Sequence, residues 1–451
     1  MGSKSLSRRG FAPSTVVALL LATLVAASCS SSKSSTAASS STAASTASSS
    51  AAGSSAGGGA TATTAAAATG TDPLGTPKAA TGTPVKIGYL TEGKGQAIDN
   101  SSEIPAAQAA VKYVNAYLGG IGGHPIELDI CDTKQTPAGT TDCNNQLITD
   151  KVPVVLDNVS SAGTELIQNL ATAGVPLMAY QSSVQAVITS PDAYVLTNGL
   201  GAVFAGPAKI AQNEGDKHGA VFVIDVPAAS APVKALYPTI WKNAGIPNID
   251  VVAIPPGVAD MTPQVQAELS KGPDLVQVLG DVTFCSSALK ALKTLSYSKT
   301  IVVIAQCITS TSAAGIPGGY AGMKETTVYS NDPSDPENQL YKAGMSKYGA
   351  GTDPYANGVT SGGWAVVVGL ARALANLSGD VTPATVKATL AAMAPTPLPL
   401  APGVTFQCAG KQIAITPAVC STGALEATLT QQGQPQGGFS ALDTTALLKL
   451  G

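Results

Sequence analysis

The sequence is poor in charged and aromatic residues. Of its 451 residues, 12% are charged and 4% are aromatic, whereas 44% are hydrophobic. This balance is typical of a packed globular protein and not of a disordered chain. Removal of the first 28 residues takes Lys plus Arg from 25 to 22 against 28 acids, a net charge near −6. No basic stripe remains, so we expect no nucleic-acid partner.

Histidine is nearly absent, and so are the common catalytic motifs. The two histidines are His124, in a Gly-Gly-His-Pro turn, and His218, in a charged segment that we expect to be a surface loop. Apart from a Gly-Ser-Ser-Ala-Gly run at residues 53–57, within a low-complexity stretch, the sequence contains no GxSxG motif, and it has no phosphate-binding loop and no CxxC pair. Nucleophilic catalysis needs a base beside the nucleophile, and zinc sites need clustered ligands. We therefore expect a protein that is not an enzyme and has no cofactor or metal.

No apolar run at the N-terminus is long enough to span a membrane. Residues 1–28 instead combine Arg8 and Arg9 with a short apolar run over residues 15–27, which predicts a signal peptide. Small residues precede Cys29 and resemble a bacterial lipobox, so we expect Cys29 to be lipidated and to be the only membrane attachment, on the outer face of the cytoplasmic membrane. Secretion without a lipid is the alternative. The arginine pair resembles a Tat signal, and a Sec signal is equally compatible.

Six cysteines remain when Cys29 is assigned to the lipid. An even number suits disulfide bonds in an oxidising compartment. Fifteen pairings are possible. The nearest-neighbour pairing, which closes three short loops, would join Cys131 with Cys143, Cys285 with Cys307, and Cys408 with Cys420.

The chain divides into a low-complexity segment and a folded part. Residues 29–84 are almost entirely Ser, Ala, Thr and Gly, which predicts a disordered tether. Its composition also permits O-glycosylation, although a plain spacer is the simpler interpretation. From residue 85 onward, short apolar strands alternate with helices, which predicts an α/β fold of βαβ units with parallel sheets in two lobes. The expected strands are 85–90, 125–130, 152–156, 175–179, 220–224, 250–254, 274–279 and 300–305.

Polar residues follow several of the predicted strands. Glu92 follows the first strand, Ser160 and Ser161 follow the third, and residues 181–183 follow the fourth. Ligands of open α/β sheets bind at the carboxyl ends of the strands, where hydroxyl and amide groups can receive a polar ligand. Any single serine here is also explained as a helix cap.

An ordered series of motifs resembles the Leu/Ile/Val-binding branch of the type I periplasmic binding proteins, which serve ABC importers. The matching segments are 85–88, 114–128, 160–161, 174–178, 260–265, 273–276 and 362–365. The resemblance implies two Rossmann-like lobes that close over a ligand, joined by a three-crossing hinge after residue 197, near residues 329–330 and around 395–402. It implies a first lobe of residues 85–197 plus 330–395 and a second of 198–329 plus 396–451.

The resemblance also implies a site, a small-molecule ligand and an ABC permease as partner, with the protein itself a monomer. The expected ligand-binding residues are Glu92, Ser160, Ser161, Gln181, Ser182, Ser183, Ala229, Asp281, Phe284 and Trp364. Phe284 stands where relatives have an acid for the ligand ammonium, although Asp281 lies close. A buried ammonium without a partner is costly, so we expect a ligand other than a standard α-amino acid, or an amino acid that is recognised differently. A sensor of the same fold is the alternative function.

Overall fold

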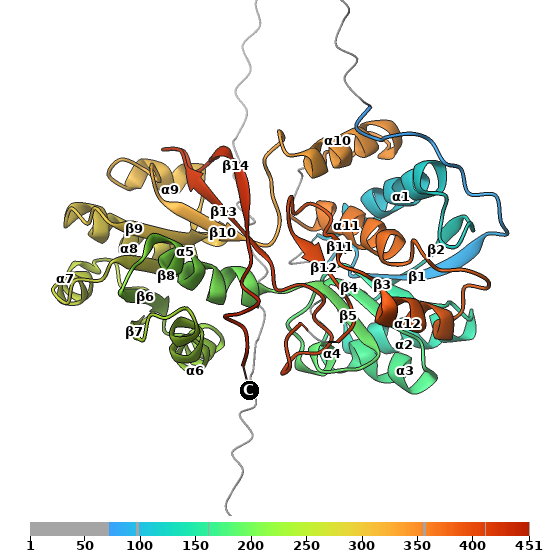
Figure 1. The fold of residues 1–451 in the computed structure, drawn as a ribbon, viewed down its shortest axis with the longest axis horizontal. Helices are drawn as coiled ribbons and strands as arrows, with labels where there is room; N and C mark the ends of the chain where they lie inside the picture. Colours follow the sequence, from blue (N-terminus) through green and yellow to red (C-terminus); the bar gives the residue numbers. More distant parts are fainter. Residues whose placement is uncertain (1–71, 96–98, 161, 355–357, 411, 451) are drawn as a thin grey trace, which may run out of the picture.

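The first of two lobes is built on a parallel sheet (Figure 1). This computed structural model describes residues 72–95, 99–160, 162–354, 358–410 and 412–450. The sheet order is β2-β1-β3-β4-β5. Its strands are β1 (Val85–Thr91), β2 (Ile126–Asp132), β3 (Val155–Asp157), β4 (Leu177–Gln181) and β5 (Ala193–Thr197).

Helices cover both faces of this sheet. The helices α1 and α11 pack above it in Figure 1, and α2 and α3 pack below it. The helix α2 begins where the side chain of Thr136 accepts a hydrogen bond from the Gly139 amide, and α3 ends at Gly174, whose φ of 72° suits glycine. The helices of this lobe are α1 (Glu103–Tyr113) with its π-helical continuation (Val114–Leu118), α2 (Pro137–Thr149), α3 (Glu165–Ala173), α4 (Gln185–Ile188), α10 (Pro336–Tyr348), α11 (Gly358–Ala373) and α12 (Pro383–Ala392).

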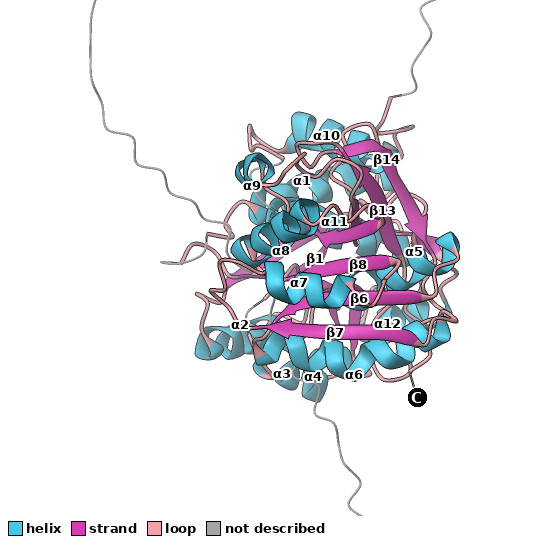
Figure 2. Ribbon diagram, turned by 90° about the vertical axis from the view of Figure 1, so that its left-hand side faces the viewer, coloured by secondary structure: helices cyan, strands magenta, loops and turns pink. Residues whose placement is uncertain are grey.

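The second lobe contains a seven-stranded mixed sheet. Figure 2 shows β7, β6 and β8 side by side, in agreement with the order β14-β13-β10-β9-β8-β6-β7. The strands β6 to β10 are parallel, and β13 and β14 add two antiparallel strands at one edge. Its strands are β6 (His218–Ile224), β7 (Asn248–Ile254), β8 (Leu275–Leu279), β9 (Thr300–Ile304), β10 (Lys324–Thr327), β13 (Ala424–Leu429) and β14 (Pro435–Leu442). Its helices are η2 (Leu200–Ala205), α5 (Gly206–Glu214), α6 (Pro227–Asn243), α7 (Thr262–Leu269), α8 (Val282–Thr294), η3 (Ala305–Cys307) and α9 (Ser310–Gly315).

Residues 396–423 pack on the first lobe, so their assignment to the second lobe was wrong. Phe406 lies in the first lobe's hydrophobic core. The Val195 amide of β5 donates to the Ala418 carbonyl at 2.8 Å, and the Cys420 amide donates back to Val195 at 2.8 Å. The chain joins the second sheet only at Ala424, the first residue of β13. This segment contains only the two-residue strands β11 (Thr396–Pro397) and β12 (Thr405–Phe406), which leave no periodic pattern in the sequence.

The end of the predicted tether belongs to the folded part. Leu74 is buried, and the Lys78 amide donates to the Ala116 carbonyl at 2.9 Å. Gly82 lies so close to His124 that a Cβ atom there would be 2.8 Å from the imidazole Nδ1. The boundary at residue 84 was therefore too late, because this stretch docks through backbone groups and one leucine instead of a hydrophobic pattern.

All three disulfide bonds follow the nearest-neighbour pairing. Cys131 joins Cys143, Cys285 joins Cys307, and Cys408 joins Cys420, with Cα–Cα distances of 5.5, 5.3 and 4.3 Å. Each bond therefore closes a short loop within one lobe. Of the fifteen pairings that the sequence allowed, the structure confirms this one.

Candidate ligand-binding crevice

The register of the first sheet brings the predicted polar residues to one edge. Leu90 of β1 pairs with Asp157 of β3, which in turn pairs with Ala179 of β4. The residues that follow these strands therefore lie at the same edge of the sheet. The Gln181 amide donates to the Asn158 carbonyl at 3.0 Å and fastens the ends of β3 and β4 together.

Glu92 and Ser160 meet at this edge, as the sequence predicted. The Ser160 hydroxyl lies 3.4 Å from Glu92 Oε1 and donates to it, while Asn100 Nδ2 donates to Glu92 Oε2 at 3.1 Å. The Ser160 oxygen also accepts the Ala162 amide at 3.0 Å. Glu92 is 5% exposed. It lines a small hollow with Gln135, Thr136, Pro137, Thr140, Ala162 and Glu165.

Behind Glu92 lies a polar network that sequence reasoning missed. Glu103, the first residue of α1, is 1% exposed and accepts hydrogen bonds from Thr91 Oγ1 at 2.5 Å and Asn158 Nδ2 at 2.9 Å. Asn158 Nδ2 also donates to the Val359 carbonyl in the first turn of α11. The network therefore holds α1, β3 and α11 in a fixed relation. Acidic residues are common in the first turn of a helix, where they interact favourably with the helix dipole. The sequence therefore provided no reason to place Glu103 in a buried polar network.

The same edge is rich in buried carboxyl groups. Burial raises the pKa of Glu103 to about 7, with the charge of Glu92 adding to the effect and the Thr91 and Asn158 hydrogen bonds opposing it. Burial, followed by the charges of Glu103 and Glu92, raises the pKa of Asp157 well above its usual range. Burial at this edge therefore disfavours a further ionised carboxylate.

The other predicted residues of the first lobe lie at the end of β4 and in the turn between β4 and α4 (Gln185–Ile188). The Ser182 hydroxyl accepts the Val184 amide at 3.3 Å, just before α4. Ser182, Ser183 and Gln181 are half-buried at the end of β4, whereas Ser161 lies outside the described residues. This turn bond leaves the second lone pair and the hydroxyl proton of Ser182 for a ligand.

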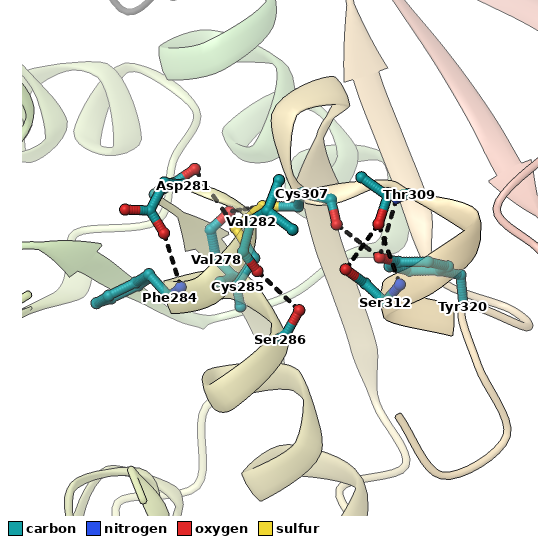
Figure 3. The surroundings of a disulfide bond; sticks show 11 residues. Val278, Asp281, Val282, Phe284, Cys285, Ser286, Cys307, Thr309, Ser312 and Tyr320 are labelled. Atoms are coloured by element: carbon teal, nitrogen blue, oxygen red, sulfur yellow. Dashed lines mark hydrogen bonds between the residues drawn. A yellow bond between two sulfur atoms is a disulfide. The ribbon is translucent and has the colours of Figure 1, made fainter. Parts of the chain in front are cut away.

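In the second lobe, Asp281 stands at the start of α8. Its carboxylate accepts the Phe284 amide at 2.9 Å and caps the helix (Figure 3). The Cys285–Cys307 bond beside it ties α8 to the turn that follows β9. Asp281 is exposed, and the neighbouring Val282 is 37% exposed. These two residues are therefore accessible at the carboxyl end of β8.

Three predicted ligand contacts are wrong because their side chains lie in the cores. Phe284 is 3% exposed, and its ring packs on Gly280. Trp364 is 1% exposed and packs between Tyr113 and Tyr341, with ring centroids 5.4 and 5.6 Å away. Ala229 in α6 is 2% exposed. These residues support the lobes instead of facing the crevice.

The predicted membrane attachment at Cys29 and the predicted signal peptide lie outside the described residues. Within the described part of the chain, no helix is both long and apolar enough to cross a membrane.

Comparison with known proteins identifies the family. Residues 84–419 match the family described as periplasmic binding protein, so the chain belongs to this family of binding proteins, which is not an enzyme family. The sequence matches none of the curated proteins with which it was compared. The expected α/β fold with two lobes of the type I periplasmic binding proteins is confirmed.

Solved structures with low sequence identity share this fold. A putative branched-chain amino acid ABC transporter protein from Rhodospirillum rubrum is 14% identical, with a TM-score of 0.66, over 78% of this chain and all of the other. An ABC transporter substrate-binding protein from Sphaerobacter thermophilus is 20% identical, with a TM-score of 0.58, over 80% and 96%. A solute-binding protein from R. palustris in complex with 4-hydroxybenzoate is 16% identical, with a TM-score of 0.55, over 80% and 97%.

Proposed function

We propose that this protein is anchored through Cys29 outside the cytoplasmic membrane, captures a small molecule between its lobes, and delivers it to an ABC permease. The observation that carries the proposal is the meeting of Glu92, Ser160 and Gln181 at the carboxyl edge of the first sheet in a periplasmic binding protein. Asp281 provides an exposed polar group at the equivalent edge of the second sheet.

The ligand presents a neutral or cationic polar group to the first lobe. The carboxyl groups of Glu92, Glu103 and Asp157 lie at or behind this edge, and each of the three residues is at most 5% exposed. A ligand carboxylate placed beside Glu92 would meet like charge where water screens it little. The α-carboxylate of a standard amino acid would therefore find no favourable contact at this edge. The R. palustris relative, which binds 4-hydroxybenzoate, takes an acid in the same fold.

A thermal-shift screen tests capture and ligand class together. The probes are α-amino acids, aromatic acids, sugars, and uncharged or cationic amides and amines. We expect a rise in melting temperature only from the sugars and from the amides and amines, because these probes carry no anionic group. A ligand at 100 times its Kd adds about 2.7 kcal/mol of stability. Tight binding of leucine, isoleucine or valine by calorimetry would contradict the proposed ligand class.

Variants place the ligand in the crevice. We expect Glu92→Gln and Ser160→Ala to weaken binding of the best ligand about tenfold, the loss of one charge-assisted hydrogen bond. Ser270→Ala is the control, because Ser270 lies at the end of α7 and bonds only its own helix at Ala267. Tighter binding by Glu92→Gln would show that an anionic group faces Glu92.

Unchanged cellular uptake of the ligand after deletion of the gene would favour a sensor over a transport protein.

A further inference from the structure

Three potential metal ligands meet at the edge of the second sheet opposite the crevice. His218 is the first residue of β6, Asp250 lies near the start of β7, and Glu268 lies in α7. One ligand atom from each residue lies within 4.8 Å of the other two. His218 Nε2 is 2.8 Å from Asp250 Oδ2. His218 is therefore a half-buried strand residue, and the surface loop expected from the sequence was wrong.

Glu268 supplies an independent observation. Its side chain is 4% exposed, yet its Oε1 atom has no hydrogen-bond partner among the described residues. A buried carboxylate oxygen without a donor is costly, and such atoms call for a ligand or an ion. Glu268 lies in the same cluster as Asp250 and His218, so a cation held by all three would satisfy this oxygen.

Lys271 supplies part of the positive charge in the absence of a metal. Its Nζ lies 2.8 Å from Glu268 Oε2 and 3.4 Å from Asp250 Oδ1. These contacts use the other oxygen of each carboxylate and leave Glu268 Oε1 without a donor. The Lys271 side chain is 51% exposed, so it can turn to solvent when a metal enters.

We propose that His218, Asp250 and Glu268 bind a divalent transition-metal ion of the zinc class. One imidazole nitrogen with two carboxylates and a water completes a tetrahedral set for Zn²⁺, whereas Mg²⁺ and Ca²⁺ prefer all-oxygen sites. The ion would tie β6, β7 and α7 together. Sequence alone predicted no metal, because the three ligands come from three separate elements and form no spaced motif.

Zinc titration of the full chain without its signal peptide tests the proposal. Cys29→Ser is included in every sample, because Cys29 is the one cysteine outside the three disulfide bonds. We expect ZnCl₂ to raise the melting temperature and EDTA to reverse the rise, whereas MgCl₂ has no effect. The chain has only two histidines, so imidazole NMR signals assign the ligand directly. Zinc should shift the signals of His218 and leave those of His124 unchanged.

Variants separate this site from adventitious zinc. We expect His218→Ala and Glu268→Gln each to weaken zinc binding about tenfold or more. His124→Ala is the matched control and should bind zinc as the parent does. The proposal would be overturned if Glu268→Gln binds zinc as tightly as the parent, or if zinc shifts the imidazole NMR signals of His124 alone. If His218→Ala does not fold, the NMR titration of the parent decides, and the absence of any zinc response in the parent overturns the proposal.

Discussion

Glu325 is a buried carboxylic acid in the middle of the second sheet. It lies in β10 between β9 and β13 and is 4% exposed. Burial raises its pKa from 4.5 to about 7. Glu103 in the first lobe is raised to about 7 as well. Between pH 4.5 and about pH 7 the folded chain therefore holds protons on Glu103 and Glu325 that the unfolded chain has released.

Glu103 and Glu325 make the folded chain less stable as the pH rises. Because each binds its proton more tightly in the folded state, their contribution to the free energy of unfolding is fully present below about pH 4.5 and is lost as the pH rises to about 7. Each of the two carboxyl groups contributes at most about 3 kcal/mol to this fall. We expect Glu325→Gln to flatten the decline measured by urea unfolding at pH 5 and pH 8, whatever its absolute stability.

The control for Glu325→Gln is an acid on the surface. Asp99 is exposed, and hydrogen bonds from Ser101 lower its pKa, so it stays ionised throughout this pH range. Asp99→Asn should keep the parent's slope between pH 5 and pH 8. An unchanged slope in Glu325→Gln would show that Glu325 does not carry the proton.

At the scale of elements, the Cys285–Cys307 bond fixes the helix that carries Asp281. It joins α8 to η3 at the carboxyl ends of β8 and β9 (Figure 3). We expect the double variant Cys285→Ser/Cys307→Ser to lose about 3 kcal/mol of stability by the chain-entropy estimate. It should also weaken ligand binding, because Asp281 then sits on a looser helix end.

Removal of a different disulfide separates these two effects. Cys131–Cys143 ties the edge strand β2 to α2 and closes a loop of similar kind. Cys131→Ser/Cys143→Ser should lower the urea midpoint by a comparable amount, and because Thr136, Pro137 and Thr140 near this bond line the hollow at Glu92, any loss of affinity there should be independent of Asp281. If Asp281→Asn alone leaves the affinity of the parent unchanged, Asp281 is not part of the site.

Helices and strands with a strong hydrophobic periodicity could be predicted from the sequence, and segments held in place by tertiary contacts could not. The strand expected at 300–305 is β9, and the strand expected at 220–224 lies within β6, which begins earlier, at His218. Residues 396–423 were assigned to the wrong lobe, because backbone bonds to Val195 decide their place.

In the candidate site, too, residues placed by the sheet register could be predicted, and residues placed by tertiary contacts could not. Glu92 and Ser160 were predicted from their positions after strands, which the sheet register fixes. Phe284 and Trp364 were placed wrongly, because a motif gives the position of a residue in the chain but not the face on which its side chain lies. Glu103 was missed because its partners, Thr91 in β1 and Asn158 directly after β3, are far from it in the sequence.

At the scale of the whole molecule, the chain passes three times between the lobes. It leaves β5 for η2, leaves β10 for α10, and leaves the Cys420 segment for β13. The second crossing is fixed to the first lobe by the Ser330 amide, which donates to the Leu400 carbonyl at 2.7 Å. The first and third crossings touch at Gly201, where a Cβ atom would lie 2.4 Å from the Thr422 carbonyl oxygen. Any hinge motion must therefore preserve a backbone contact that only glycine permits.

Gly201→Ala tests this contact. The clash is with backbone atoms, so the two crossings must move apart, and we expect a loss of about 1–3 kcal/mol in urea unfolding. Gly199→Ala is the matched control: Gly199 caps the same helix, and its Cβ would meet only Val203 at an ordinary 3.6 Å. The control should be neutral or slightly stabilising, because alanine restricts the unfolded chain. If both variants are equally stable, the crossings separate freely at Gly201. If Gly201→Ala is destabilised and also binds the screened ligand more weakly, the same contact sets the angle between the lobes.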